Sequence, residues 1–206
     1  MRLYLIRHAE PEGAAGRCLG HTDHTLSAAG RRGVEALAAG WRVPPTRVVA
    51  SDLARTREPA AVLAAGWALP VRLEPRLREM HFGAWDGRLW DAVRADDATR
   101  YAGWQTAWST APAPGGESFA EVADRVGAWW EEERETLAPD DALAVVAHAG
   151  SLRALLCHLL PLPLDRAFQL RIDYARVTAV SLAGPRPELL LLNADRLPEE
   201  PAPAGG

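Results

Sequence analysis

Five side chains able to hold a tetrahedral anion follow the ends of expected strands: Arg7, His8, Arg55, Glu79 and His148. Two guanidinium groups, two imidazoles and one carboxylate suit a phosphate-like dianion, because arginine forks pair bidentately with its oxygens. In open α/β sheets, ligands collect beyond the carboxyl ends of the strands. If the strands are parallel and adjacent, the five residues converge on one crevice although they lie far apart in the chain.

Taken one at a time, these residues have ordinary structural explanations. Arg7 and His8 can be the polar end of a strand. Arg55 can be a solvated residue on a capped helix, and Glu79 can form a surface ion pair with its arginine neighbour. The grouping therefore carries the inference, not any single residue.

The hydrophobic pattern predicts the elements that position them. Residues 3–6 are an apolar run suited to a buried strand that leads directly into Arg7 and His8. Residues 51–56 open a helix after another buried strand, and the free N–H groups of such a helix start favour an anion beside Arg55. The other expected elements are a helix at 27–40, strands at 46–51, 71–74 and 143–147, helices starting at 118–121 and 148, and a hairpin of 177–182 with 187–192.

Residues 85–118 differ in character from the rest of the chain. They contain four of the eight tryptophans, at positions 85, 90, 104 and 108. The segment is expected to leave the sheet as an excursion that can cover a pocket. The tryptophans can equally well fill a core, and the sequence leaves both interpretations open.

Together these elements predict an α/β fold: a three-layer α/β/α sandwich around a mostly parallel central sheet, with a helical lid excursion at about 85–118. With 206 residues, of which 48% are hydrophobic, the chain suits one domain, which we assign to 1–195. Residues 196–206 are rich in Pro, Gly and Glu and are expected to be a disordered tail.

Composition argues against several classes of function. The net charge of −4 argues against general nucleic-acid binding, and no apolar run approaches the roughly 20 residues that span a bilayer. Cys18 and Cys157 provide neither a disulfide framework nor a four-ligand zinc site. All 23 basic residues are arginine, which excludes Schiff-base chemistry and a Walker-type lysine. We therefore expect a soluble, cytoplasmic protein that binds neither nucleic acid nor membrane.

His21 and His24 are separated by three positions, a spacing that metal ligands can have. The surrounding loop provides no third partner of clear spacing. We therefore expect exposed or substrate-facing histidines here, and no metal site.

The sequence resembles the histidine phosphatase superfamily, which is also called the phosphoglycerate mutase-like superfamily. Its Arg-His-Gly opening is matched at 7–9, with Ala9 in place of glycine. Four motifs in the family's order carry the resemblance: Arg-His at 7–8, Ser-x-Leu-x-Arg-Thr at 51–56, Arg-Glu-x-x-Phe-Gly-x-Trp-Asp-Gly at 78–87, and Val-x-His-x-Gly at 146–150.

The resemblance implies a two-step phosphoryl transfer without metal or cofactor, on a small phosphorylated metabolite. Neutral His8 would attack phosphorus while a backbone carbonyl holds its other ring nitrogen. Arg7, Arg55 and a protonated His148 would neutralise the phosphoryl oxygens. Glu79 would protonate the leaving oxygen and then activate water. A homodimer is a further expectation.

The match has a gap at two positions. Many members place a threonine and an asparagine where this chain has Pro11 and Ala14, so an expected polar phosphate contact is missing. Gly20 and His21 are candidates to replace it. The resemblance also implies Ala149, directly after His148, as a substrate contact.

Within the superfamily, the stretches 2–8, 79–87 and 104–118 most resemble the α-ribazole phosphatases of cobalamin assembly, whose substrate carries an aromatic base. A broad-specificity phosphomonoesterase and a phosphoglycerate mutase are alternatives, although 85–118 does not resemble a mutase lid. An inactive module that binds a phosphorylated ligand is the alternative of another class, and it would have no need of His8 and Glu79.

Overall fold

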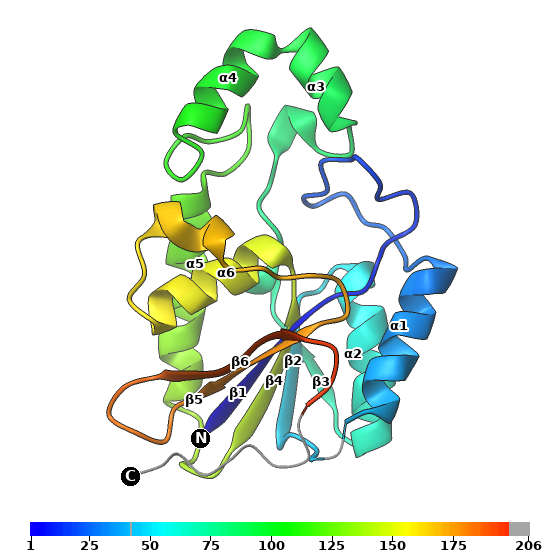
Figure 1. The fold of residues 1–206 in the computed structure, drawn as a ribbon, viewed down its shortest axis with the longest axis vertical. Coiled ribbons are helices and arrows are strands. Elements are labelled where there is room, and N and C mark those ends of the chain that lie inside the picture. Colours follow the sequence, from blue (N-terminus) through cyan, green and yellow to red (C-terminus); the bar gives the residue numbers. More distant parts are fainter. Residues whose placement is uncertain (42, 198–206) are drawn as a thin grey trace.

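A six-stranded sheet forms the centre of the computed structural model, which describes residues 1–41 and 43–197 (Figure 1). The strands follow the order β3-β2-β4-β1-β5-β6. The neighbouring strands from β3 to β1 pair in parallel, and β5 pairs antiparallel with both β1 and β6. The predicted mostly parallel sheet is thus confirmed. The strands are β1 Arg2–Arg7, β2 Arg47–Ala50, β3 Val71–Leu73, β4 Ala142–Ala147, β5 Val177–Ser181 and β6 Glu188–Ala194.

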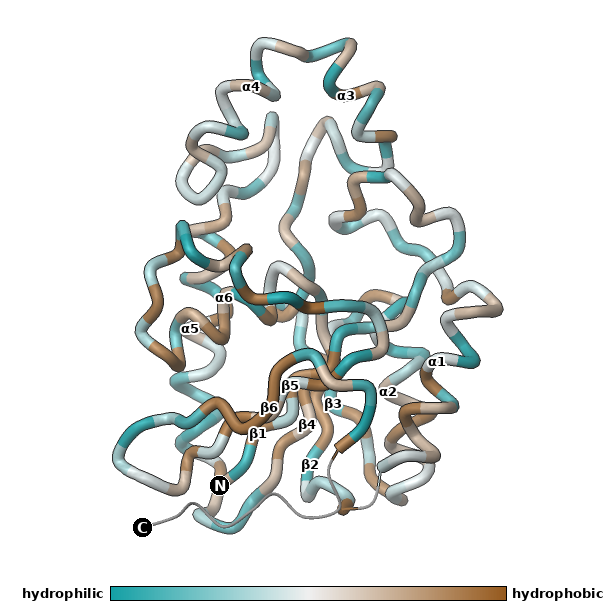
Figure 2. Tube along the Cα trace, in the orientation of Figure 1, coloured by the Kyte–Doolittle hydropathy of each residue, from teal (hydrophilic) through white to brown (hydrophobic). Residues whose placement is uncertain are grey.

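Helices cover both faces of this sheet, as the predicted three layers require. Leu3 and Leu5 of β1 pack into the core beneath α5 and α6, whereas Tyr4 and Ile6 pack beneath α1 and α2, because successive strand residues point to opposite faces. Figure 2 shows hydrophobic stretches along the central strands. The covering helices are α1 Ala28–Ala39, α2 Ala54–Trp67, α5 Phe119–Arg134 and α6 Ala149–Leu159.

The tryptophan-rich excursion rises beyond the carboxyl ends of the strands (Figure 1). It contains the short 3₁₀ helix η2 Gly83–Trp85, helix α3 Trp90–Asp96 and helix α4 Ala98–Thr106. Trp85 is fully buried, and the rings of Trp90 and Trp104 stack with centroids 6.0 Å apart. These aromatic residues pack against the main core, so the excursion is both a cover and an extension of that core.

Two further 3₁₀ helices, η1 Pro75–Leu77 and η3 Leu164–Gln169, precede segments that reach the same end of the sheet. Among the described residues, no helix has the length and apolar character needed to cross a bilayer.

The carboxyl-terminal boundary differs from the expectation. Leu197, which belongs to the predicted tail, is buried and packs with Tyr4 and Val177 in the core beneath α1 and α2. The prediction of a tail from residue 196 is therefore wrong for Leu197, because its side chain completes that core. The rest of the predicted tail, 198–206, lies outside the described residues.

Candidate active site

The register of three parallel strands brings the predicted residues together. Arg7 pairs with Ala147 across β1 and β4, and the His8 N–H donates to the Ala147 carbonyl at 2.9 Å. His8 and His148 therefore leave the sheet at the same level, and their ring centroids lie 5.0 Å apart. Ser51 follows β2 at this edge, since its N–H donates to Val146 at 3.0 Å. Parallel pairing thus converts distant chain positions into one cluster.

The His8 imidazole is held in one defined tautomer. Its Nδ1–H donates to the Ala9 carbonyl at 2.7 Å, which leaves the lone pair on Nε2. Burial, reinforced by the charges of Arg55 and Arg7, holds the pKa of His8 well below its usual range. The hydrogen bond to a backbone carbonyl expected from the sequence is confirmed, and the imidazole is neutral.

His148 is also neutral in this structure. The Arg55 Nε–H donates to His148 Nδ1 at 3.2 Å, so the imidazole carries its proton on Nε2, which donates to Ser51 Oγ at 2.9 Å. Burial and the Arg55 charge hold the pKa of His148 well below its usual range. The resemblance implies a protonated His148 during phosphoryl transfer. This structure gives the neutral imidazole, because the Arg55 N–H occupies Nδ1, where a second proton would bind.

Arg55 is completely buried instead of solvated. Its Nη1 and Nη2 groups donate to the carbonyl oxygens of Thr22 and Gly20 at 2.9 and 2.5 Å. The amino terminus of α2, expected to favour an external anion, is met by the protein's own Asp23, whose carboxylate accepts from the Ala54 N–H at 2.7 Å. Arg55 therefore joins the 20–23 loop to the histidine pair.

The Arg7 side chain meets the segment 172–174. Its guanidinium stacks on the Tyr174 ring at 3.8 Å, and Nη1 donates to the Ile172 carbonyl at 2.7 Å. Its Nε is buried and has no hydrogen-bond partner in the described part of the chain. The recorded hydrogen bonds of Arg7 and Arg55 go to neutral acceptors, so two cations face this site without a bonded carboxylate. A dianion would provide the missing counter-charge.

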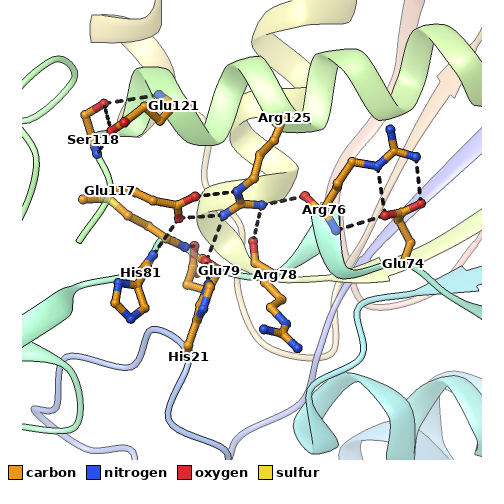
Figure 3. Close-up of polar contacts among 11 residues, drawn as sticks. His21, Glu74, Arg76, Arg78, Glu79, His81, Glu117, Ser118, Glu121 and Arg125 are labelled. Atoms are coloured by element: carbon orange, nitrogen blue, oxygen red, sulfur yellow. Dashed lines mark hydrogen bonds and ion pairs between the residues drawn. The ribbon is translucent and has the colours of Figure 1, made fainter. Parts of the chain in front are cut away.

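Glu79 lies at the amino terminus of α6. Its carboxylate oxygens accept from the N–H groups of Met80 and Gly150, each at 3.1 Å. Its carbonyl accepts from His21 Nε2–H at 2.8 Å (Figure 3). The surface ion pair with Arg78, considered from the sequence, does not form, since the Arg78 guanidinium pairs with Asp52 at 2.5 Å.

Gly20 and His21, predicted to contact the substrate, form hydrogen bonds within the protein instead. The Asp86 carboxylate accepts from the backbone N–H groups of Gly20, His21 and Thr22 at 2.8, 2.6 and 3.0 Å. These amides are occupied, so the expectation that they replace the missing phosphate contact is not supported by the geometry. Sequence reasoning missed this role of Asp86, although its place in the 78–87 motif was a signal.

Ala149 and His21 were the other candidates for contact with a substrate or a metal. Ala149, the third predicted contact, is the first residue of α6, where helix N–H groups lack intrahelical acceptors. His21 packs on His81, with ring centroids 4.8 Å apart, and within the described residues no group of three or more His, Cys, Asp or Glu could hold a metal ion.

The two neutral histidines predict that acid destabilises the fold. An unfolded histidine binds a proton near pH 6.5, but folded His8 and His148 resist protonation, so the unfolded state binds more protons below that pH. Stability is therefore expected to fall below pH 6.5, by at most roughly 1.4 kcal/mol per pH unit for each histidine. Urea unfolding of the wild type and His148→Gln at pH 7.5, 6.5 and 5.5 measures this. A variant with the same pH slope as the wild type would contradict it.

Comparison with known proteins agrees with this geometry. The sequence model of the Histidine phosphatase superfamily (branch 1) matches residues 3–195. The chain is 31% identical over 196 residues to the adenosylcobalamin/alpha-ribazole phosphatase of Salmonella typhimurium, covering 94% of this chain and 96% of the relative. It is 35% identical over 171 residues to the glucosyl-3-phosphoglycerate phosphatase of Mycobacterium tuberculosis, covering 79% and 76%.

Solved structures give the same result. The alpha-ribazole phosphatase from Shigella flexneri superposes with a TM-score of 0.88 at 28% identity, covering 97% of this chain and all of that one. The chain belongs to the histidine phosphatase superfamily, as its motifs predicted. It is a phosphatase, and the phosphatases among its relatives act on small phosphorylated compounds.

Proposed function

We propose that this enzyme hydrolyses α-ribazole 5′-phosphate through a phosphohistidine on His8. The observation that carries the mechanism is the Nδ1–H bond from His8 to the Ala9 carbonyl, because it directs the Nε2 lone pair away from that carbonyl as a neutral nucleophile. The charges of the fully buried Arg55 and of the half-buried Arg7 both act on the His8 imidazole.

In the first step, His8 Nε2 forms a bond to phosphorus while the ester P–O bond breaks. Glu79 gives its proton to the leaving oxygen, which departs as an alcohol. In the second step, the Glu79 carboxylate takes a proton from water as the water oxygen bonds to phosphorus. The P–N bond breaks, and inorganic phosphate leaves with His8 neutral again.

Charge stabilisation in this proposal comes from two arginines and a neutral imidazole. Arg7 and Arg55 oppose the charge that spreads over the phosphoryl oxygens. His148 contributes one N–H, at Nε2, which Ser51 accepts in the free enzyme. No metal or cofactor takes part in any step.

The substrate assignment is supported by the names of relatives and by an exposed aromatic ring. Phe168 in η3 is 62% exposed, and its ring packs edge-on against Trp108 at 4.6 Å. The Arg153 guanidinium lies 4.8 Å from the same ring, and the charges of Glu79 and Arg7 act on Arg153. Of the four tryptophans that were candidates to stack on a base, Trp85 is buried and Trp90 and Trp104 pack on each other. Trp108 packs on Phe119 and on Phe168 itself. We therefore assign base stacking to Phe168.

A substrate panel with chelator present tests this function. The wild type is expected to have a higher kcat/KM on α-ribazole 5′-phosphate than on glycerol phosphate or glucosyl-3-phosphoglycerate. Because stacking of a base on an aromatic side chain contributes about 1–3 kcal/mol, Phe168→Ala should lower kcat/KM on α-ribazole 5′-phosphate by roughly 5- to 150-fold. Glycerol phosphate hydrolysis should change little. Val62→Ala, at another exposed apolar position, on α2, is the control.

The alternative functions predict different activities on the same set of substrates. A broad-specificity phosphomonoesterase would show similar kcat/KM values on all esters. A phosphoglycerate mutase would interconvert phosphoglycerates with little phosphate release, and a binding module would turn over nothing. Each of these results would reject the substrate assignment.

We further propose that the enzyme acts in the cytoplasm, where its expected metabolite would be found. We also propose that it assembles as a homodimer. The exposed Leu189, Leu190 and Leu192 of the edge strand β6 support an apolar contact with a second copy.

A further inference from the structure

Glu79 is carried by a segment that has no regular secondary structure of its own. It follows η1 and precedes η2, so no helix or strand fixes the direction of its side chain. A general acid must nevertheless be held close to its working position, because a displacement of about 1 Å can cost roughly 100-fold in rate. Contacts from other elements must therefore supply the rigidity.

The Arg125 side chain of α5 supplies most of these contacts (Figure 3). Its Nη1 donates to the carbonyl oxygens of Arg76 and Arg78 at 2.6 and 2.9 Å. Its Nη2 donates to the Glu79 carbonyl at 3.0 Å. One guanidinium thus binds three carbonyl oxygens within four successive residues, ending at Glu79 itself.

Glu117 adds hydrogen bonds to the backbone that follows Glu79. Its carboxylate accepts from Arg125 Nε and Nη2 at 2.8 and 3.0 Å, in the bidentate arrangement of a strong ion pair. The same carboxylate accepts from the His81 N–H at 2.8 Å, and the Glu117 N–H donates to the His81 carbonyl at 2.7 Å. Arg125 and Glu117 together hold the backbone on both sides of Glu79.

We propose that Arg125 is a positioning residue for Glu79: with Glu117 it fixes the 76–81 backbone so that the Glu79 carboxylate stays at the Gly150 N–H. This inference rests on the proposed role of Glu79 as proton donor. Arg125 touches neither phosphate nor the reacting atoms, since its recorded hydrogen bonds go to backbone carbonyls and to Glu117. Its proposed effect on the proton transfer is the place it gives to Glu79.

The basicity of the leaving group separates this role from general support of the fold. The alkoxide of glycerol phosphate needs a proton to leave, whereas the p-nitrophenolate of p-nitrophenyl phosphate leaves without one. Loss of acid positioning therefore slows the first ester far more than the second. A general loss of folded enzyme slows both equally. The parameter to compare is kcat/KM, because it reports the steps up to formation of the phosphoenzyme.

The experiment measures kcat/KM of Arg125→Met and Arg125→Lys on both esters. Each is expected to lose roughly 10- to 100-fold on glycerol phosphate and less than about threefold on p-nitrophenyl phosphate. Arg125→Lys keeps the charge beside Glu117 but cannot bind three carbonyl oxygens at once. It therefore still tests the positioning role if Arg125→Met folds poorly. Arg134→Met, an exposed arginine at the end of the same helix, is the matched control and should leave both values unchanged.

Glu79→Gln distinguishes failure of this inference from failure of the proposed function. It should show the same selective loss, and adding Arg125→Met to it should cause no further loss on glycerol phosphate, because both changes remove one proton transfer. Selective loss in Glu79→Gln with equal losses on both esters in the Arg125 variants would overturn the positioning role alone. Equal losses in Glu79→Gln would overturn the acid role and with it this inference.

Discussion

Replacing His8 by alanine is expected to lower kcat by roughly 10⁴-fold or more, since removal of a catalytic nucleophile has effects of this size in other covalent enzymes. Rapid acid-free quenching of the wild type with a ³²P-labelled phosphate ester should trap label on protein in a form that acid releases and base preserves. Peptide mapping should place that label on His8.

Two variants make this result specific. His158→Ala, which replaces a histidine of α6 that contacts Glu131, should keep wild-type turnover and labelling. His148→Ala should still accept label on His8, more slowly, because His148 is proposed to stabilise charge and not to form the covalent bond. Label retained by His8→Ala, or label that survives acid, would show that another group attacks phosphorus.

The gathering of these residues could be predicted because it depends on local signals. Each apolar run of about four residues ends in a polar residue, and parallel strands end at one edge of the sheet. The strand register aligns the residues that follow: because Arg7 lies opposite Ala147, His8 is level with His148. A pattern read along the chain is sufficient for this, since it needs only strand ends and parallel pairing.

The partners of these residues could not be predicted, because they come from loops without periodicity. The N-cap of α2 is Leu53, which has no side-chain acceptor, and the cap comes from Asp23, about thirty positions earlier. The neutral state of His148 likewise depends on the direction of one Arg55 N–H. Sequence gives the residue types of such contacts but not the atoms that meet.

The same limit explains why Glu79 was found and its support was not. A glutamate in a recognisable motif stands out, whereas Arg125 lies within a helix whose apolar spacing only predicts a core face. Its three carbonyl acceptors are backbone atoms, which leave no trace in residue types. Positioning of a catalytic group by backbone contacts is therefore invisible to motif analysis, and only coordinates show it.

Replacing Gly150 by alanine is expected to lower kcat/KM on glycerol phosphate by roughly 100-fold while the protein stays folded. A Cβ at this position would lie 2.1 Å from Glu79 Oε1, and the atom that must move is the end of a flexible side chain. The backbone of α6 accepts alanine readily, because alanine is a better helix former than glycine by up to about 1 kcal/mol. Thermal unfolding should therefore show no loss of stability although Glu79 is displaced from the Gly150 N–H.

Gly66→Ala isolates this steric effect from the change in helix propensity, since Gly66 lies within α2 and a Cβ there meets nothing within 4 Å. It should gain similar stability and keep full activity. Because Gly150→Ala displaces the proton donor and leaves His8 in place, its loss on p-nitrophenyl phosphate should be much smaller than on glycerol phosphate. Equal losses on the two esters would mean that the added methyl group disturbs the phosphate site itself, and full activity on both would mean that the Glu79 carboxylate has no fixed working position.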